Sequence, residues 1–254
     1  MKIGCIIQAR TGSKRFPSKI LQKIDNNKNI LDYVIEQTKF CKSINQIIIA
    51  TTQNDEDKII NEICKKHNLN CFMGNENDLV DRYYQCAKNF NLDVIVRVTG
   101  DNPLNDPEII DKLVLEFVKR DVDFATNEKI RTYPQGVFCQ IFSFKTLEDV
   151  WKNAKLPSER EHVSPYIHNN FHKFSIYSLE FEQNLSNIRV TVDRENDLKM
   201  VKAIIKRIRK RPIHFQDILR AYNENPELSN INKNHILDEG YKISLIEDKK
   251  FLNN

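Results

Sequence analysis

Short apolar runs alternate with helix-period patterns along the first half of the chain. β-branched runs of the kind that form strands covered on both faces predict strands at Ile3–Gln8, Gln46–Thr51, Asn70–Met73 and Asp93–Val98. Patterns with helical spacing lie between these runs and predict helices at Ile30–Phe40, Asp55–His67 and Leu79–Phe90. Alternation of this kind is typical of a parallel sheet with helices on both faces.

The second half of the chain is less regular. An Asp-Pro pair suits a helix cap and first turn, so a helix is predicted from Asp106-Pro107 to about Lys119. The next segments look like strands of mixed direction, interleaved with helices, at Gly136–Phe144, Lys173–Leu179 and Ile188–Val192. Two final helices are predicted near Glu195–Arg209 and Phe215–Asn223. We expect one α/β domain over residues 1–225 and a C-terminal extension over residues 226–254, whose packing the pattern leaves open.

Composition narrows the class of protein. A chain of 254 residues with 40% hydrophobic content can bury the core of one large α/β domain. The net charge of +4 is too small to indicate nucleic-acid binding. No apolar stretch approaches the length of a membrane span, and the first apolar run is too short for a signal peptide. The six cysteines form no CxxC pair, so neither a zinc site nor a disulfide framework is indicated. We expect a cytoplasmic protein with reduced cysteines.

The loop after the first predicted strand carries the strongest chemical signal. It reads QARTGSKRFPSK and places guanidinium groups at Arg10 and Arg15, an ammonium at Lys19 and exposed N–H groups around Gly12. Ligands of open α/β sheets bind beyond the carboxyl ends of strands, and these kinds of contact together suit a triphosphate. The sequence therefore predicts a polyphosphate-binding loop, with a solvated basic loop as the alternative. The two standard nucleotide motifs, GxxxxGKS/T and GxGxxG, are absent.

The segment QARTGSKRFPSKIL resembles the signature of sugar nucleotidyltransferases of glycosyltransferase-A-like fold. The resemblance is to the spore-coat polysaccharide (SpsF-like) cytidylyltransferases and, more distantly, to the 3-deoxy-manno-octulosonate and acylneuraminate cytidylyltransferases. Five further blocks look like that group's, in the same order, over roughly the first four fifths of the chain. They are ATTQNDED (50–57), DLVDRYYQCAK (78–88), VIVRVTGDNPLNDPEIID (94–111), REHVSPYI (160–167) and TVDRENDL (191–198).

This resemblance implies a fold and a reaction. The fold is the three-layer α/β/α nucleotide-diphospho-sugar transferase (glycosyltransferase-A-like) fold with a mostly parallel central sheet. The reaction is the magnesium-dependent transfer of a nucleotidyl group, most simply from CTP, to a sugar phosphate, an ulosonic acid or another small phosphorylated acceptor. Pyrophosphate would be released, and the product would serve surface polysaccharide or glycoconjugate synthesis. Members of this group commonly form homodimers, so we expect one here.

Two aspartates are the candidate metal ligands. Asp101 follows a predicted strand in TGDNP, and Asp193 stands between a predicted strand and a helix in RVTVDRENDL. Taken alone, Asp101 suits a turn and Asp193 a helix N-cap. The resemblance implies instead that the two carboxylates face each other across the cleft and hold Mg²⁺ against the α-phosphate. It also implies that the catalytic cations that stabilise the departing pyrophosphate are Arg10, Arg15 and Lys19.

Substrate contacts are expected on both sides of this centre. The resemblance implies nucleotide contacts at Gln8, Ala9, Arg10, Gly12, Ser13, Arg15, Lys19, Thr51, Thr52, Asp81 and Arg82. Asp81 and Arg82 could instead pair with each other on a helix face. The choice of cytosine as the base rests on the resemblance alone, so GTP and UTP remain possible substrates. Acceptor contacts are expected at Tyr133, Gln135, Gly136, Gln140, Arg160, Glu161 and His162.

The chain departs from its relatives at GVFCQ (136–140). Where the SpsF-like group shows a G-hydrophobic-D-x-E segment, Phe138 and Gln140 replace the two carboxylates. We therefore expect a different acceptor, and a non-sugar phosphate is conceivable. Two other functions remain open. A glycosyltransferase of this fold normally carries an Asp-x-Asp metal motif, and Gly100-Asp101-Asn102 is not one. A non-catalytic nucleotide-binding protein would bind nucleotide without releasing pyrophosphate.

Overall fold

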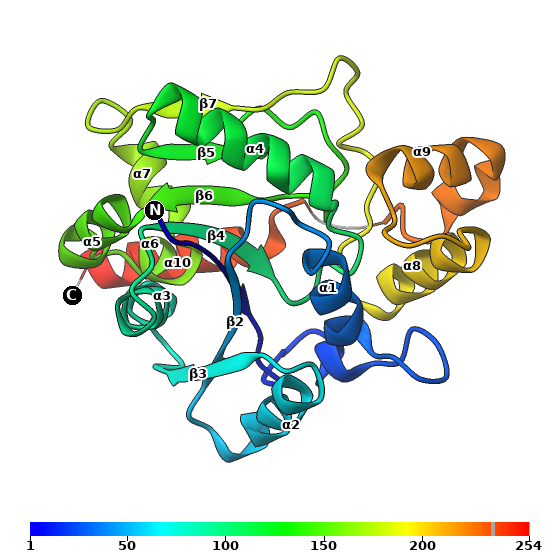
Figure 1. Ribbon diagram of the computed structural model, residues 1–254, viewed down its shortest axis with the longest axis horizontal. Coiled ribbons are helices and arrows are strands. Elements are labelled where there is room, and N and C mark those ends of the chain that lie inside the picture. The colour runs from blue at the N-terminus through cyan, green and yellow to red at the C-terminus, as the bar shows by residue number, and fades with distance from the viewer. Residues whose placement is uncertain (235–236, 254) are drawn as a thin grey trace.

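A seven-stranded sheet runs through the middle of the computed structural model, which describes residues 1–234 and 237–253 (Figure 1). The strand order is β3-β2-β1-β4-β6-β5-β7. The strands are β1 (Ile3–Gln8), β2 (Gln46–Thr52), β3 (Asn70–Gly74), β4 (Val94–Thr99), β5 (Phe124–Thr126), β6 (Gln140–Ser143) and β7 (Ile176–Ser178). Neighbouring strands in this sheet run parallel to each other, except that β6 runs antiparallel to both β4 and β5. The predicted mostly parallel sheet is confirmed.

Helices cover both faces of this sheet. They are α1 (Ile30–Thr38), α2 (Lys58–Lys66), α3 (Leu79–Asn89), α4 (Pro107–Arg120), α5 (Phe144–Asn153), α6 (Pro157–His162), α7 (Ser164–Asn169), α8 (Glu195–Arg207), α9 (Phe215–Glu224) and α10 (Glu239–Leu252). α1, α2 and α4 lie on one face, and α3, α5 and α7 lie on the other. This is the expected three-layer α/β/α architecture.

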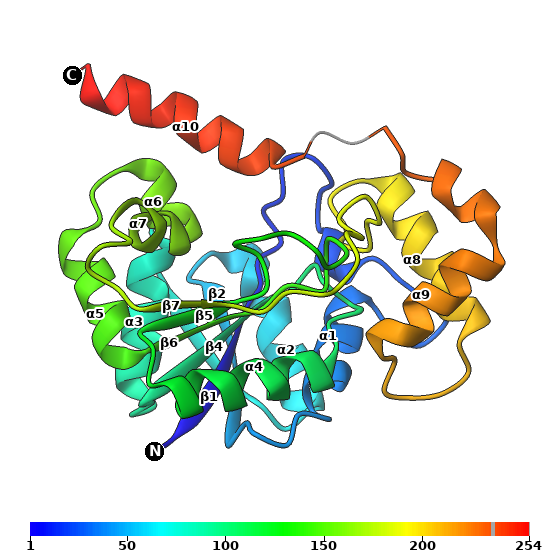
Figure 2. The ribbon, with the colours of Figure 1, turned by 90° about the horizontal axis from the view of Figure 1, so that it is seen from above.

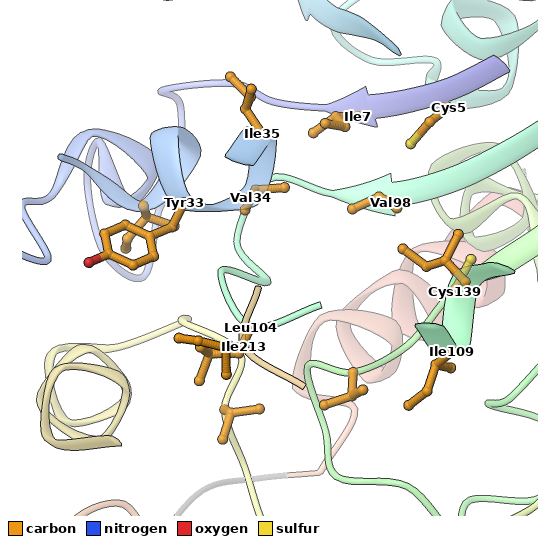
Figure 3. Packing of buried hydrophobic residues seen from close by; sticks show 14 of the residues in the cluster. Cys5, Ile7, Tyr33, Val34, Ile35, Val98, Leu104, Ile109, Cys139 and Ile213 are labelled. Atoms are coloured by element: carbon orange, nitrogen blue, oxygen red, sulfur yellow. The ribbon is translucent and has the colours of Figure 1, made fainter. Parts of the chain in front are cut away.

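The central strands are buried on both faces. In β1, Cys5 and Ile7 belong to the hydrophobic cluster under α1 and α4, whereas Ile6 belongs to the cluster under α3 and α5. Figure 3 shows Cys5 and Ile7 of β1 beside Val98 of β4, with Val34 and Ile35 of α1 packed next to them. A strand covered on both faces must be apolar at consecutive positions, which is why these strands are continuous β-branched runs. This burial fixes the strand ends that carry the candidate site.

One predicted strand is wrong. The segment Ile188–Val192 forms only an isolated bridge, between Arg189 and Gln135. Its backbone is held by loops: Val190 N donates to the Gln135 carbonyl at 2.7 Å, and Val192 N donates to the Asp101 carbonyl at 2.9 Å. The alternation of apolar residues therefore reflects burial between two loops, and it places Asp193 beside the loop that follows β4.

The C-terminal extension packs on the body of the molecule. Figure 2 shows α10 lying across one side, from the loop that follows β1 to beyond α6 and α7. Asp248 accepts hydrogen bonds from Ser158 N at 2.8 Å and from Ser158 Oγ at 2.6 Å. Ser244 Oγ lies 3.0 Å from His162 Nε2. The packing that the sequence left open is thus a helix against α6. Across the described residues, none of the helices has both the length and the apolar character needed to cross a membrane.

Candidate active site

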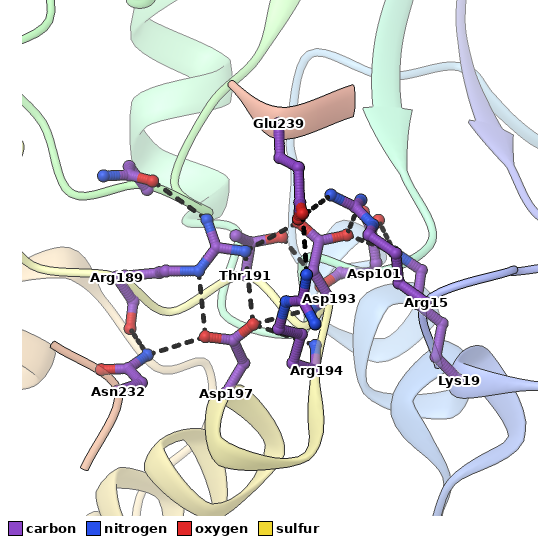
Figure 4. Close-up of polar contacts among 11 residues, drawn as sticks. Arg15, Lys19, Asp101, Arg189, Thr191, Asp193, Arg194, Asp197, Asn232 and Glu239 are labelled. Carbon is purple, nitrogen blue, oxygen red and sulfur yellow. Dashed lines mark hydrogen bonds and ion pairs between the residues drawn. The ribbon is translucent and has the colours of Figure 1, made fainter. Parts of the chain in front are cut away.

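Three chain segments that are far apart in sequence meet at one ammonium group. Lys19 follows the loop after β1, Asp101 follows β4, and Asp193 precedes α8. Lys19 Nζ lies 2.5 Å from Asp101 Oδ2 and 2.8 Å from Asp193 Oδ1, as Figure 4 shows. The carboxyl ends of parallel strands meet at one edge of a sheet, which is why a residue after β1 and one after β4 converge. The two predicted metal ligands therefore lie together, with a cation between them.

Asp193 is surrounded by positive charge. Besides Lys19, Arg15 Nη2 lies 2.6 Å from its Oδ1 and Arg189 Nη2 lies 2.7 Å from its Oδ2. Arg189 is buried and is held in turn by Asp197, whose Oδ1 accepts from Arg189 Nε at 2.9 Å. Burial acts to raise the pKa of Asp193, but Lys19, Arg15 and Arg189 outweigh it and hold that pKa well below its usual range. Asp193 is therefore charged at neutral pH.

The pKa of Lys19 moves the other way. Burial acts to lower this pKa, but attraction to Asp101 and Asp193 raises it above its usual value. The stabilising contribution of Lys19 is thus present below its unfolded-state pKa and is lost only as the pH rises through the raised value. The contribution of Asp193 is present above its unfolded-state pKa and is lost as the pH falls toward the lowered value. Both groups keep their charges through the neutral range.

The donor set fits a magnesium ion. Two carboxylates converge on a point that already accepts a cation, the Lys19 ammonium. Mg²⁺ binds hard oxygen ligands and is commonly held by one or two carboxylates together with phosphate oxygens and water. Among residues 1–234 and 237–253 there is no cluster of three or more acidic, histidine or cysteine ligands. Asp101 and Asp193 would therefore hold the ion together with substrate oxygens.

The loop after β1 is anchored by a residue that the sequence did not single out. Asp57 is buried, and its Oδ1 accepts from Thr11 N at 2.6 Å and from Thr11 Oγ1 at 2.7 Å. Its other oxygen accepts from Thr52 Oγ1. The adjacent Gly12 N–H donates to no described residue, so it is available to an anion. Asp57 thus fixes the turn that presents this N–H group.

Replacing Asp57 with alanine should destabilise the protein and weaken nucleotide binding. The change leaves the buried Thr11 N–H without its acceptor, so the free energy of unfolding should fall by about 2 to 4 kcal/mol. Urea denaturation measures the loss, and the KM for the nucleotide should rise with it. Asp55→Ala is the matched control, because Asp55 is exposed and pairs only with Lys58. Equal stability of the two variants would contradict the anchoring role.

Four other predicted nucleotide residues lie at the end of β2 and in the first turn of α3. Thr51 and Thr52 are buried at the end of β2. Arg82 donates to the carbonyl of Asn75 at 2.8 Å and shapes that loop, while Asp81 Oδ1 accepts from Trp151 Nε1 at 2.8 Å. Asp81 and Arg82 thus have separate partners. Beyond the ends of β2 and β3 lies a cavity of about 480 Å³, lined by Gln53, Asn54, Phe72, Met73, Gly74, Asn75, Glu76, Asp81 and Gln85.

Two of the predicted acceptor residues, Glu161 and His162, lie in α6 against α10, and a third, Gln140, lies in β6. Glu161 Oε1 is 3.7 Å from Arg10 Nη2, so the structure joins a predicted nucleotide residue to a predicted acceptor residue. His162 lies beneath Ser244, and burial lowers its pKa, which favours the neutral imidazole. Gln140 begins β6, and its Oε1 accepts from Arg97 Nη1 at 3.0 Å.

The other four predicted acceptor residues support neighbouring segments. Tyr133 is buried, with its ring 5.4 Å from that of Phe215. Arg160 donates to the carbonyl of Trp151 at 2.8 Å and pairs with Asp78. The Gln135 carbonyl holds the segment that leads to Asp193. Gly136 has φ of +103°, and a Cβ there would lie 2.4 Å from the Thr191 nitrogen, so only glycine fits. Sequence reasoning also passed over Arg97, Arg189 and Glu239, although Arg97 lies within the block 94–111 and Arg189 begins the segment RVTVDRENDL.

Glu239, at the start of α10, reaches into the cation cluster. Its Oε2 lies 3.0 Å from Arg15 Nη1, and its Oε1 lies 2.7 Å from Arg194 Nη2, as Figure 4 shows. The Glu239 carboxylate thus occupies one N–H group of the Arg15 guanidinium, which was predicted to bind the triphosphate. A triphosphate that uses this face of Arg15 must displace Glu239.

Replacing Glu239 with glutamine should therefore tighten nucleotide binding. Removing the competing charge frees Arg15, and for a partly exposed pair the gain should lower the KM for the nucleotide about two- to fivefold. Initial-rate kinetics at saturating acceptor measures this change. Glu247→Gln is the matched control, since Glu247 is an exposed acidic residue on the same helix. A KM that is unchanged or raised in Glu239→Gln would show that Glu239 does not compete with the nucleotide.

Comparisons with known proteins agree on one group. The family model described as cytidylyltransferase matches residues 4–243. The spore coat polysaccharide biosynthesis protein SpsF of Bacillus subtilis (strain 168) is 29% identical over 229 residues, which are 87% of this chain and 94% of that protein. A solved cytidylyltransferase from Leptospira borgpetersenii serovar Hardjo-bovis (strain JB197) superposes with a TM-score of 0.87 at 35% identity, over 93% of this chain and 99% of that one. The structure of CMP:2-keto-3-deoxy-manno-octonic acid synthetase complexed with CTP shares the fold, with a TM-score of 0.62 at 16% identity over 81% of this chain and 99% of that one.

Proposed function

Since this chain belongs to the cytidylyltransferase family, we propose that it is a magnesium-dependent enzyme that couples CTP to a small phosphorylated or sugar-like acceptor and releases pyrophosphate. The resemblance read from the ordered sequence blocks is confirmed, and the protein is a nucleotidyltransferase. The observation that carries the proposal is the convergence of Asp101 and Asp193 on Lys19, with Arg15 alongside. The product would enter polysaccharide or glycoconjugate synthesis, as the name of the Bacillus subtilis relative suggests. The homodimer and the cytoplasmic location stay predictions.

The reaction is a displacement at phosphorus. An oxygen of the acceptor attacks the α-phosphorus of CTP, and the bond from that phosphorus to the bridging oxygen breaks. Pyrophosphate leaves with the electron pair of that bond. Negative charge builds up on the leaving group, so fixed cations beside it supply much of the rate. Arg15 and Lys19 are the two cations held closest to the carboxylate pair.

Each charged group of the cluster has a role in this step. Asp101 and Asp193 would hold Mg²⁺, which would polarise the α-phosphate and neutralise developing charge. Lys19 and Arg15 neutralise the two carboxylates in this structure. Once Mg²⁺ takes over that role, they would bind the triphosphate instead. Arg189 keeps Asp193 ionised and oriented from the buried side. The cluster is therefore neutralised by its own cations before substrate binds.

Among the predicted acceptor residues that the structure describes, His162 is the one imidazole that could take up a proton. Its Nε2 lies 3.0 Å from Ser244 Oγ of α10, so this nitrogen already has a partner. An acceptor phosphate is an anionic nucleophile and needs no proton removed, whereas the hydroxyl of an ulosonic acid does. The site therefore favours a phosphate acceptor.

The test is pyrophosphate release with Mg²⁺ and each of CTP, GTP, UTP and ATP, crossed with sugar 1-phosphates, 2-keto-3-deoxy acids and non-sugar phosphates. We expect release with CTP and with one class of acceptor only. Consumption of a nucleotide sugar without pyrophosphate would instead identify a glycosyltransferase. Nucleotide binding with no release, in the presence of a cell extract that supplies every native acceptor, would identify a non-catalytic binding protein.

A further inference from the structure

Arg97 is an arginine that the proposed mechanism leaves without a role. It lies on β4, opposite Ile6 of β1 and Gln140 of β6, and it is half-buried. Its Nε donates to Gln8 Oε1 at 3.1 Å and its Nη1 donates to Gln140 Oε1 at 3.0 Å. The guanidinium carbon also lies 5.9 Å from the centre of the Tyr83 ring. Neutral groups thus hold its position.

No carboxylate within the described residues forms an ion pair with Arg97. The arginines of the cation cluster differ in this respect: Arg15 pairs with Asp193 and Glu239, and Arg189 pairs with Asp193 and Asp197. A charge that is partly removed from water requires a counter-charge or strong hydrogen bonds. Arg97 has two amide oxygens as partners, and they orient the guanidinium without cancelling its charge. Its Nη2 donates to no described residue.

Gln140 contacts both Arg97 and an acidic side chain, Glu128. Gln140 Nε2 donates to Glu128 Oε2 at 2.8 Å and to Ser164 Oγ at 3.1 Å, while its Oε1 faces Arg97. The amide therefore stands between a guanidinium and a carboxylate, and each keeps its own charge. Gln8 is fixed on the other side, because its Oε1 also accepts from Tyr83 OH at 3.1 Å. Both amides have one oxygen turned toward Arg97.

We propose that Arg97 binds an anionic group of the acceptor, a phosphate or a carboxylate, and that Gln8 and Gln140 orient the guanidinium for this contact. The proposal rests on the proposed function, because it assigns the acceptor end of the same reaction. Arg97 neighbours the predicted acceptor residue Gln140 and lies on the sheet face covered by α3 and α7, next to the end of β1. A planar guanidinium binds an oxyanion through two parallel hydrogen bonds. The acceptor must therefore carry a negative charge.

Exchanging the amide and the carboxylate beside Arg97 tests this role with little change elsewhere. In the double variant Glu128→Gln and Gln140→Glu, the net charge and the hydrogen bond between the two side chains are conserved. The carboxylate, however, now faces Arg97 and neutralises it. The single variant Glu128→Gln is the matched control, because it removes the same acid and leaves Arg97 uncompensated. Neither residue belongs to the cation cluster.

The probes are inorganic phosphate and acetate, titrated into protein labelled with ¹⁵N at the arginine side chains. We expect the Arg97 Nε–H resonance to shift and saturate in the wild type and in Glu128→Gln. In the double variant the apparent affinity at Arg97 should fall at least about tenfold, as expected when a charge-assisted contact is cancelled. A stronger response to phosphate or to acetate identifies the anion. An Arg97 resonance that does not respond to either probe, or responds equally in the double variant, overturns the proposal.

The same spectra separate this proposal from the proposed function. Titration with CTP and Mg²⁺ should shift the Arg15 resonance, whatever happens at Arg97. If Arg15 responds and Arg97 ignores both anions, the acceptor assignment is wrong and the nucleotide assignment stands. If Arg97 binds anions and Arg15 ignores CTP, the anion site stands and CTP is the wrong nucleotide.

Discussion

Replacing Lys19 with methionine should reduce nucleotidyl transfer by about 100- to 1,000-fold, because the preorganised charge that stabilises the departing pyrophosphate is removed. Methionine keeps most of the length and volume of the side chain. The lost group is the ammonium that lies 2.5 Å from Asp101 and 2.8 Å from Asp193. Single-turnover pyrophosphate release at saturating CTP measures the effect on the chemical step.

The same variant should show that a divalent cation can replace the ammonium. Without Lys19, the two partly buried carboxylates face each other, and breaking such a charge cluster costs about 3 to 5 kcal/mol of unfolding free energy. Mg²⁺ should restore more thermal stability to Lys19→Met than to the wild type, because it would bind between Asp101 and Asp193 in place of the ammonium that they share. Transfer within threefold of the wild-type rate would show that Lys19 has no role in catalysis. An absence of any extra magnesium response would show that the carboxylates are not metal ligands.

Replacing Asp193 with asparagine should have an effect of similar size. The amide is isosteric and its oxygen still accepts hydrogen bonds, but it lacks the charge that would hold Mg²⁺ and that offsets Arg15 and Arg189. We expect transfer to fall by about 100- to 1,000-fold, with the loss mainly in kcat, since the lost charge acts in the transition state. A magnesium titration of the residual activity should require a higher concentration to saturate.

Asp217→Asn is the matched control for Asp193→Asn. Asp217 is a buried aspartate in the first turn of α9, and, like Asp193, it pairs with a cation, since its Oδ1 lies 3.0 Å from Lys210. Burial acts to raise its pKa, but Lys210 and the backbone N–H of His214 lower it, as the cation cluster does for Asp193. Asp217→Asn should lose stability without losing transfer. If the two variants lose activity equally, the effect at Asp193 is structural.

The placement of Asp101 beside Lys19 could be predicted from the sequence because a general rule governs it. Both residues follow apolar strands, and parallel neighbours end at the same edge of the sheet. The network behind Asp193 could not be predicted in this way. Arg189 and Asp197 meet because the segment before α8 is held by the loops at Gln135 and Asp101. Such contacts depend on loop positions, which no local periodicity encodes.

Two other elements could not be predicted correctly from the pattern of apolar and polar residues. In the run Ile188–Val192 every second residue is β-branched, apolar and buried, and burial alone does not require a paired strand. The helix α10 follows a polar, Asn-rich stretch and leaves Ile243, Ile246, Phe251 and Leu252 exposed. Its apolar residues therefore do not mark a single buried face, so its docking against α6 depends on polar contacts such as those of Asp248 with Ser158.

The structure shows what the unusual segment GVFCQ (136–140) does to the charges around it. Gln140 lies between Arg97 and Glu128, where a carboxylate would neutralise the guanidinium. Phe138 is partly buried and packs against the core, so it does not replace a lost hydrogen-bond acceptor. The amide at position 140, where the resemblance leads one to expect a carboxylate, therefore leaves the charge of Arg97 uncancelled.

The most direct test of the central claim follows the fate of the α-phosphate. The protein would be incubated with Mg²⁺, a small-molecule extract of the native cells and CTP labelled at the α-phosphorus. The account predicts that the label moves into a new compound that contains CMP, that an equal amount of unlabelled pyrophosphate appears, and that both depend on Lys19. Label that stays in CTP, or that appears only in free CMP, would contradict it.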